Sequence, residues 1–232
     1  FQEMVNKNKV VVLMSGTLHS SDVLSEIFGI DKFKIIEAET ENPGKINILR
    51  TGEEMDCKYS NFFSGKAERK KYLQTLDKCI EIAEKPVLIH VNSFGDLPDR
   101  FEREKFDLRY VITREDLIEL QIRDKENNMV KKFKEGRMNI LFSTKCSRGV
   151  DFPGDECKTI VFTKFPNPNV QDAFWKILNK TNPQKYWSFY KDKARREILQ
   201  KIYRGVRFKE DEVTLMSPDL RVLNFFKEKA SS

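Results

Sequence analysis

The pattern of apolar and polar residues predicts an α/β fold with a largely parallel central sheet that is flanked by helices on both faces. Short continuous apolar runs recur along the chain, which is typical of strands buried on both sides. Segments with helical periodicity separate most of these runs, as in successive strand–helix–strand units. The chain has 232 residues, of which 39% are hydrophobic, so it can bury a sizeable core in one large domain or two small ones.

Eight segments are predicted as strands, because each is a short apolar run bounded by polar or turn-forming residues. They lie at residues 9–14, 33–37, 46–50, 86–91, 108–112, 138–142, 159–163 and 213–216. Helices are predicted where apolar residues recur at helical spacing between capping residues and glycines. They cover residues 21–28, 67–83, a charged stretch after residue 95, and residues 124–135, 169–179 and 183–204. The polar residues 51–65 predict a loop.

The charge of the chain is concentrated near its C-terminal end. The net charge is +6, and residues 191–209 alone contain eight Lys or Arg residues and two acidic residues. A local basic excess of this size is typical of a surface that meets nucleic acid or a nucleotide, although it is also compatible with an ordinary solvated face.

No apolar run approaches the 18 residues of a membrane span, and there is no signal peptide, so we expect no membrane partner. The chain is therefore predicted to be intracellular: cytoplasmic in a prokaryote or an archaeon, and nuclear in a eukaryote. The four cysteines form no C-x-x-C pair and both histidines are isolated, so no metal site is predicted. The first residue is not Met, which suggests a piece of a longer protein.

Polar residues follow three of the predicted strands, at the edge where open parallel sheets bind their ligands. They are Ser15 and Thr17, Asn92 and Ser93, and the stretch from Thr144 to Asp151. A single Ser or Thr after a strand is more often a cap than a ligand contact. The third stretch is more specific, because it combines a hydroxyl, an arginine, a carboxylate and a glycine, Gly149, that allows close backbone approach.

The predicted helix 183–204 has an apolar stripe, which we expect to be buried, formed by Trp187, Tyr190, Ala194, Ile198 and Ile202. Gln200, Arg204 and Arg207 are spaced by four and three residues, which predicts that they share another face of this helix. Arginine suits bidentate phosphate binding and the stabilisation of charge during phosphoryl transfer. The alternative for an isolated arginine pair is a solvated basic face.

Taken in order, these stretches resemble the C-terminal motor domain of superfamily 2 helicases, and most closely the XPD-like DNA repair helicases and their DinG relatives. The resemblance covers essentially the whole chain and rests on the third, fourth, fifth and sixth motifs of the family, seen here as Ser15-Gly16-Thr17-Leu18, residues 86–94, residues 144–154, and Gln200 to Arg207, with Asp219 and Arg221 following. Two positions depart from the XPD-like pattern. Arg148 stands where Glu is usual in the fifth motif, and Tyr203 stands where Gly usually precedes the first arginine of the sixth.

The resemblance implies a RecA-like motor domain that contributes to ATP hydrolysis, single-stranded DNA translocation and duplex unwinding in DNA repair. It implies catalytic roles, as arginine fingers and their partner, for Arg204, Arg207 and Gln200. It implies nucleotide contacts for Asp151, Gly149 and Arg148. It implies DNA contacts for Asn92, Ser93, Phe94 and Thr144. It implies that Ser15 and Thr17 relay the nucleotide state to the DNA.

Other parts of such a motor are missing from the sequence. Gly149 and Gly154 have the spacing of a phosphate loop, but Asp155 follows where lysine is required, and no carboxylate pair follows a strand as a magnesium site needs. The resemblance therefore implies that ATP and Mg²⁺ are bound mainly by an absent first motor domain, which is also expected to carry an iron–sulfur cluster. Residues 1–30 are predicted to be the tail of that domain or the edge of this one, and residues 31–232 the second motor domain. The isolated chain is predicted to be an inactive monomer.

Two alternatives stay open from the sequence. One is a non-catalytic RecA-like module that binds nucleic acid or a protein, since a fold can be shared without its chemistry. The other is half of an RNA helicase, since contacts with a nucleic-acid backbone mark DNA and RNA poorly.

Overall fold

The structure is a computed structural model that describes residues 2–15, 17–36, 44–146 and 149–230. The chain divides into two compact units. Unit 1 consists of residues 1–40 and 166–200, and unit 2 consists of residues 41–165 and 201–232. The predicted boundary near residue 30 stays a prediction about the longer protein, because this division concerns only contacts within the chain.

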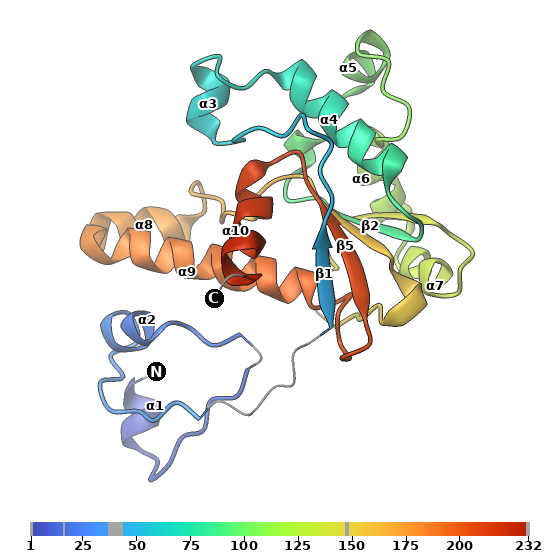
Figure 1. The fold of residues 1–232 in the computed structure, drawn as a ribbon. Helices are drawn as coiled ribbons and strands as arrows, with labels where there is room; N and C mark the ends of the chain where they lie inside the picture. Colours follow the sequence, from blue (N-terminus) through green and yellow to red (C-terminus); the bar gives the residue numbers. More distant parts are fainter. Residues whose placement is uncertain (1, 16, 37–43, 147–148, 231–232) are drawn as a thin grey trace. The chain divides into compact units, whose positions relative to one another are not determined.

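Unit 2 contains a five-stranded parallel sheet, which confirms the predicted α/β class (Figure 1). The strand order is β1-β5-β4-β2-β3. The strands are β1 (Lys45–Ile48), β2 (Val87–His90), β3 (Ile140–Ser143), β4 (Thr159–Phe162) and β5 (Glu212–Met216). Every residue of β2 and β4 is buried, as their continuous apolar sequences require when a sheet is covered on both faces.

Helix α4 (Arg69–Ile82) covers one face of this sheet. It buries an apolar stripe at helical spacing, formed by Tyr72, Leu73, Leu76, Cys79 and Ile80. This stripe belongs to the same core cluster as Val87, Ile89 and Val161, which are alternate residues of β2 and a residue of β4. Among the described residues, the other α-helices of unit 2 are α3 (Tyr59–Phe63), α5 (Arg100–Lys105), α6 (Arg114–Arg123), α7 (Asn128–Lys134) and α10 (Leu220–Ala230), and two short 3-10 helices cover Phe94–Asp96 and Gly154–Glu156.

Unit 1 contains α1 (Gln2–Asn6), α2 (Ser21–Glu26), α8 (Ala173–Thr181) and most of α9 (Pro183–Ile202). Its core joins Val23 of α2 to the buried aromatic residues Trp175, Tyr186 and Phe189 of α8 and α9. Ser20, one residue before the predicted helix 21–28, is the N-cap of α2 and accepts a hydrogen bond from the Val23 amide. None of the helices in the described ranges combines the length and apolarity needed to cross a membrane.

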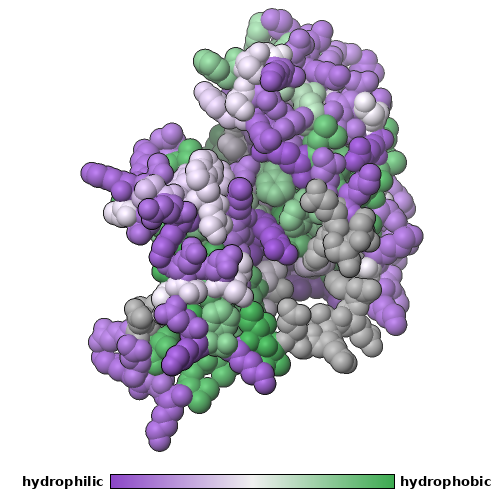
Figure 2. Space-filling view, turned by 60° about the vertical axis from the view of Figure 1, so that its left-hand side comes forward, coloured by the Kyte–Doolittle hydropathy of each residue, from purple (hydrophilic) through white to green (hydrophobic). Residues whose placement is uncertain are grey.

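The strand predicted at residues 9–14 is wrong, since this segment is irregular. Its side chains are largely solvent-exposed, with Val10 at 78% and Met14 at 89%. Figure 2 shows a hydrophobic patch at the lower end of the view, at the height where Figure 1 draws the N-terminal segment. An apolar sequence favours a buried strand only when neighbouring strands can pair with it, and in the described residues no backbone hydrogen bond does so.

Two more predicted strands are wrong. Residues 33–36 are irregular, and residue 37 lies outside the described residues. Residues 108–112 form a loop, because the Asp77 carboxylate of α4 accepts hydrogen bonds from the amides of Arg109, Tyr110 and Val111 at 3.1, 2.7 and 2.7 Å. These amides are therefore satisfied without a neighbouring strand.

Two details of the predicted helix 183–204 are also wrong. Trp187 is exposed, and Tyr186 and Phe189 occupy the buried positions instead. The helix ends at Ile202, so Arg204 and Arg207 do not share a helical face with Gln200. The chain turns at Gly205, where an added Cβ would lie 2.9 Å from Ile160 Cδ1 of β4. The chain thus approaches the sheet closely at Gly205, at the point where the predicted helix would have continued.

The loop predicted at residues 51–65 contains the short helix α3.

Candidate functional site

The carboxyl ends of β2 and β3 bring together the residues predicted to contact DNA. The two strands pair in parallel, with His90 opposite Ser143, so the chain leaves both strands at the same edge of the sheet. Asn92, Ser93 and Phe94 follow β2, and Thr144 follows β3. Ser93 is exposed and Thr144 is half-buried. The Thr144 hydroxyl donates a hydrogen bond to Gln121 Oε1 of α6 at 3.1 Å.

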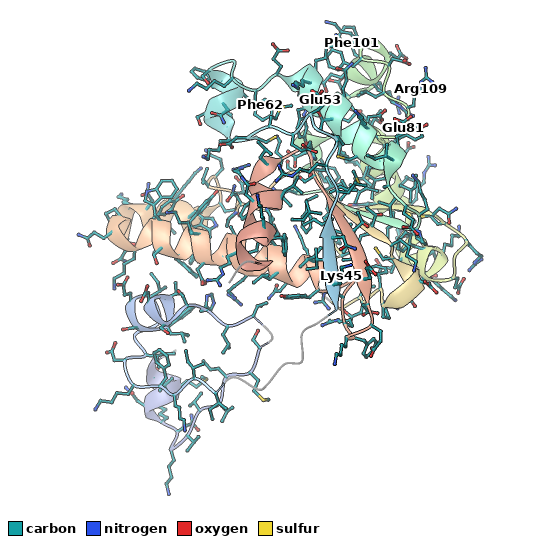
Figure 3. All side chains as sticks on the ribbon, viewed as in Figure 1. Lys45, Glu53, Phe62, Glu81, Phe101 and Arg109 are labelled. Carbon is teal, nitrogen blue, oxygen red and sulfur yellow. The ribbon has the colours of Figure 1, made fainter. Side chains whose placement is uncertain are left out.

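A buried carboxylate fixes the loop after β2. Asp96 Oδ2 accepts hydrogen bonds from the Ser93 amide at 3.0 Å and from the Thr163 hydroxyl at 3.1 Å, and Lys164 Nζ lies 3.0 Å from Oδ1. The ammonium group of Lys164 also lies 4.8 Å from the ring centroids of both Phe62 and Tyr72. Phe62 projects from α3, as Figure 3 shows. Sequence reasoning missed Asp96 and Lys164, although Ser93 and Asp96 have the spacing of a capping box.

Asp151 brings the two arginines of the sixth-motif segment together. Its Oδ1 accepts a hydrogen bond from Arg204 Nη1 at 2.7 Å and another from Arg207 Nη2. Partial burial would raise the pKa of Asp151, but the hydrogen bonds and charges of Arg207 and Arg204 outweigh it and hold this pKa below its ordinary value. The structure thus pairs a fifth-motif residue with two sixth-motif residues more than 50 positions away.

Asp211, which sequence reasoning also missed, fixes the backbone on both sides of this cluster. Its buried carboxylate accepts hydrogen bonds from the amides of Arg207 at 2.6 Å, Phe208 at 2.7 Å and Gly154 at 2.9 Å. In addition, the Phe152 amide donates to the Arg204 carbonyl at 2.7 Å. The cluster therefore lies on segments that lead into β4 and β5, whereas Asn92 to Phe94 and Thr144 lie beyond the carboxyl ends of β2 and β3.

The other predicted nucleotide contacts are less well defined. Gly149 has a φ of +74°, a conformation that glycine adopts without strain, and there is open space where a side chain would be. Arg148 and Gly16 lie outside the described residues.

In unit 1, the third-motif segment contacts α9. Gln200 Nε2 donates a hydrogen bond to Thr17 Oγ1 at 2.7 Å, and Arg196 Nε donates to the Thr17 carbonyl at 2.8 Å. Ser15 is exposed, and its hydroxyl lies 3.2 Å from both the amide and the carbonyl of Thr17. Thr17 and Gln200, both singled out from the sequence, are thus direct partners across 183 positions.

Within the described parts of the chain, no group of three or more His, Cys, Asp or Glu residues could hold a metal ion. The four cysteines are free and buried. Burial raises the pKa of Cys79 to about 12 and that of Cys157 to about 12, so these thiols are protonated and unreactive at neutral pH.

The family described as the helicase C-terminal domain matches residues 76–230, which include the loop after β2, Asp151 and both arginines. The chain belongs to this family. No curated protein matches the sequence of this helicase C-terminal domain.

Two solved structures are similar to this helicase domain over nearly its whole length. One is described as an XPD helicase, with a TM-score of 0.65 and 19% identity, and the match covers 98% of this chain and 42% of that one. The other is the S. tokodaii protein Xpd4, with a TM-score of 0.58 and 19% identity, and the match covers 99% of this chain and 44% of that one. The RecA-like fold predicted from the XPD resemblance is confirmed, and the chain spans less than half the length of either structure.

Proposed function

We propose that this chain is the second motor domain of an ATP-dependent DNA helicase of the XPD type and that it supplies two arginines to the ATP site. The observation that carries the proposal is the convergence of Arg204 and Arg207 on Asp151. A carboxylate that holds two guanidiniums keeps them ordered at a surface where a phosphate group can replace it, since arginine binds both anions in the same planar geometry.

ATP supplies the phosphoanhydride bond that is hydrolysed, and the first motor domain supplies most of the groups that bind ATP and Mg²⁺. In this chain, Arg204 and Arg207 stabilise negative charge on the transferred phosphoryl group, and Gln200 lies four positions before the first of them. Asp151 holds both arginines until the nucleotide is bound. Gly149 lets the neighbouring backbone approach the nucleotide. Arg148, in the fifth-motif segment, adds a guanidinium to the two of the sixth-motif segment.

Single-stranded DNA is the proposed partner of the sheet edge beyond β2 and β3. Asn92, Ser93 and Thr144 carry groups that can hydrogen-bond to phosphate oxygens, and Phe94 can stack on a base. The loop that carries Ser93 is anchored by buried Asp96, so it is ordered before DNA binds. The exposed apolar run at residues 9–14 supports the proposal that residues 1–30 complete the first motor domain, in whose sheet this run would be buried.

The test uses the full-length protein that contains this chain, with ATP hydrolysis measured with and without single-stranded DNA. In Arg204→Ala, DNA-stimulated hydrolysis should fall about 10³–10⁵-fold, as for other arginines that stabilise a transferred phosphoryl group, while nucleotide binding stays measurable. Arg109→Ala is the matched control, because Arg109 is exposed and its guanidinium pairs with Asp107 on a separate loop (Figure 3). Near-normal turnover in Arg204→Ala would mean that this residue is not the arginine finger.

The isolated chain gives a second test. It should hydrolyse no ATP above background, because its sequence contains no phosphate loop. Robust turnover by the purified 232-residue chain would contradict its assignment as a second motor domain. Binding of single-stranded DNA without any arginine-dependent hydrolysis in the full-length protein would favour the non-catalytic module instead.

A further inference from the structure

Helix α9 presents a row of polar side chains to the third-motif segment. Asp192, Arg196 and Gln200 are spaced by four residues, so they lie on one face of the helix. Each of them bonds to a residue between Thr17 and Ser20. Sequence reasoning identified Gln200 but missed the other two. A signal was present in the sequence, because Asp192 and Arg196 continue toward the N-terminus the four-residue spacing that separates Gln200 from Arg204.

His19 joins the two charged members of this row. Its Nδ1 lies 2.6 Å from Asp192 Oδ2, and Arg196 Nη1 lies 2.6 Å from its Nε2 and 3.0 Å from its Nδ1. With its proton on Nδ1, the imidazole donates to the carboxylate and leaves Nε2, the ring nitrogen nearer to the guanidinium, to accept from Arg196. The ring also packs against Phe28 and Phe189, with centroid distances of 5.1 and 5.7 Å.

The second oxygen of Asp192 holds the backbone beside His19. Asp192 Oδ1 accepts a hydrogen bond from the Ser20 amide at 3.0 Å, and Ser20 is in turn the N-cap of α2. The side chain of Asp192 is only 8% exposed, so the carboxylate is held in one place by two partners. The segment from Thr17 to Ser20 is therefore attached to α9 at its carbonyl, hydroxyl, imidazole and amide groups.

We propose that His19, Asp192 and Arg196 are positioning residues that hold Thr17 on Gln200, and that they thereby support the relay from ATP to DNA that the motif resemblance implies for Thr17. The inference rests on the proposed function. The Thr17–Gln200 bond directly links the third- and sixth-motif segments, and α9 ends two residues before Arg204. Arg196 holds the backbone carbonyl of Thr17, whereas Gln200 holds its hydroxyl.

The experiment measures base pairs unwound per ATP hydrolysed by the full-length protein at saturating ATP and DNA. Arg196→Gln removes the guanidinium that bridges Thr17 and His19. It should lower this ratio about tenfold, within the range found for residues that modulate coupling, and leave the KM for ATP within about twofold of wild type. Arg195→Gln is the matched control, because it removes the same charge from the adjacent, exposed position, and it should leave the ratio unchanged.

Thr17→Val provides a second variant that keeps the shape of the side chain and removes only the hydroxyl that binds Gln200. It should reproduce the loss seen in Arg196→Gln, and it decides the question if thermal unfolding shows that Arg196→Gln does not fold. A ratio in both variants equal to that of Arg195→Gln would overturn the inference, and so would a parallel loss of hydrolysis and unwinding. Absence of DNA-stimulated hydrolysis in the wild-type protein is a different result, and it would overturn the proposed function.

Discussion

The two units each join residues that are distant in sequence, but they do so with different chemistry. In unit 2, one carboxylate, Asp151, holds two guanidiniums, and its side chain is 43% exposed. In unit 1, Thr17 is held by hydrogen bonds from an amide and a guanidinium, which buried or partly buried groups position in turn. The contact in unit 2 can exchange its carboxylate for another anion, whereas the contact in unit 1 offers no such exchange. We infer that the first belongs to ligand binding and the second to transmission.

Three aspartates allow this comparison to be tested with one substitution, because Asp→Asn keeps the shape and removes the charge. Asp211 and Asp192 are almost fully enclosed and support the backbone, while Asp151 is partly exposed and, among the described residues, accepts from the side chains of Arg204 and Arg207. The chain also has a separate probe for each unit. Both tryptophans, Trp175 and Trp187, lie in unit 1, and all four cysteines lie in unit 2.

Asp211→Asn should have the largest effect on stability. The carboxylate accepts three backbone hydrogen bonds while buried, and the amide that replaces it offers only one acceptor atom. Leaving buried donors unsatisfied should lower the free energy of unfolding of unit 2 by about 2 kcal/mol. Thiol labelling through opening of unit 2 should then be about 30-fold faster than in the wild-type chain.

The control for this variant is Asp77→Asn. The Asp77 carboxylate also accepts hydrogen bonds from three backbone amides, but these belong to the loop 109–111 and not to the segment that carries Arg204 and Arg207. Both variants should speed thiol labelling. Only Asp211→Asn should also reduce DNA-stimulated ATP hydrolysis by the full-length protein at temperatures where both remain folded. Equal hydrolysis in the two variants would show that Asp211 stabilises the fold without positioning Arg207.

Asp192→Asn should have a smaller effect, and it should be confined to unit 1. The asparagine can still accept one hydrogen bond, so the loss is the charge-assisted part of the contacts with His19 and Ser20, about 1 kcal/mol. The urea midpoint reported by tryptophan fluorescence should fall by about 1 M for a unit of this size. Thiol labelling should stay at the wild-type rate, and an equal change in both probes would contradict separate units.

The sequence predicted the sheet of unit 2 better than it predicted unit 1, for a physical reason. Strands β2 and β4 are buried on both faces, so their apolar runs identify them without knowledge of their neighbours. The run at residues 9–14 has the same character but is exposed and irregular, because strand formation also depends on a pairing partner. A run of apolar residues thus identifies a segment that can form a strand, and the presence of a neighbouring strand determines whether it does.

The candidate site could be predicted only in part for a related reason. Chemistry and spacing identified Asp151, Arg204 and Gln200, because these residues lie in motif-like stretches. Asp211 and Asp192 could not be found in that way. Their importance comes from the amides they accept, and a lone aspartate in a charged stretch is usually solvated.

Asp151→Asn should have the smallest effect on stability, and that effect should depend on pH. An ion pair this exposed contributes no more than about 1 kcal/mol at neutral pH. Its pKa is lowered in the folded chain, so the stabilisation is complete above the ordinary value of 3.8 and is lost as the pH falls through the lower folded value. Urea unfolding of both proteins should therefore give a small difference at pH 7 that disappears as the pH falls below the lowered pKa of Asp151, because the other carboxylates titrate alike in both and cancel.

The size and the pH dependence of the stability loss in Asp151→Asn distinguish a ligand-binding role of Asp151 from a role in supporting the fold. If Asp151 mainly holds the arginines for a phosphate group, Asp151→Asn should cost the folded chain little at any pH and yet change the KM for ATP of the full-length protein. A loss of stability that matches that of Asp211→Asn and persists in acid would contradict this view. It would show that Asp151 is a structural support like Asp211, and the contrast between an exchangeable contact in unit 2 and a fixed one in unit 1 would then be wrong.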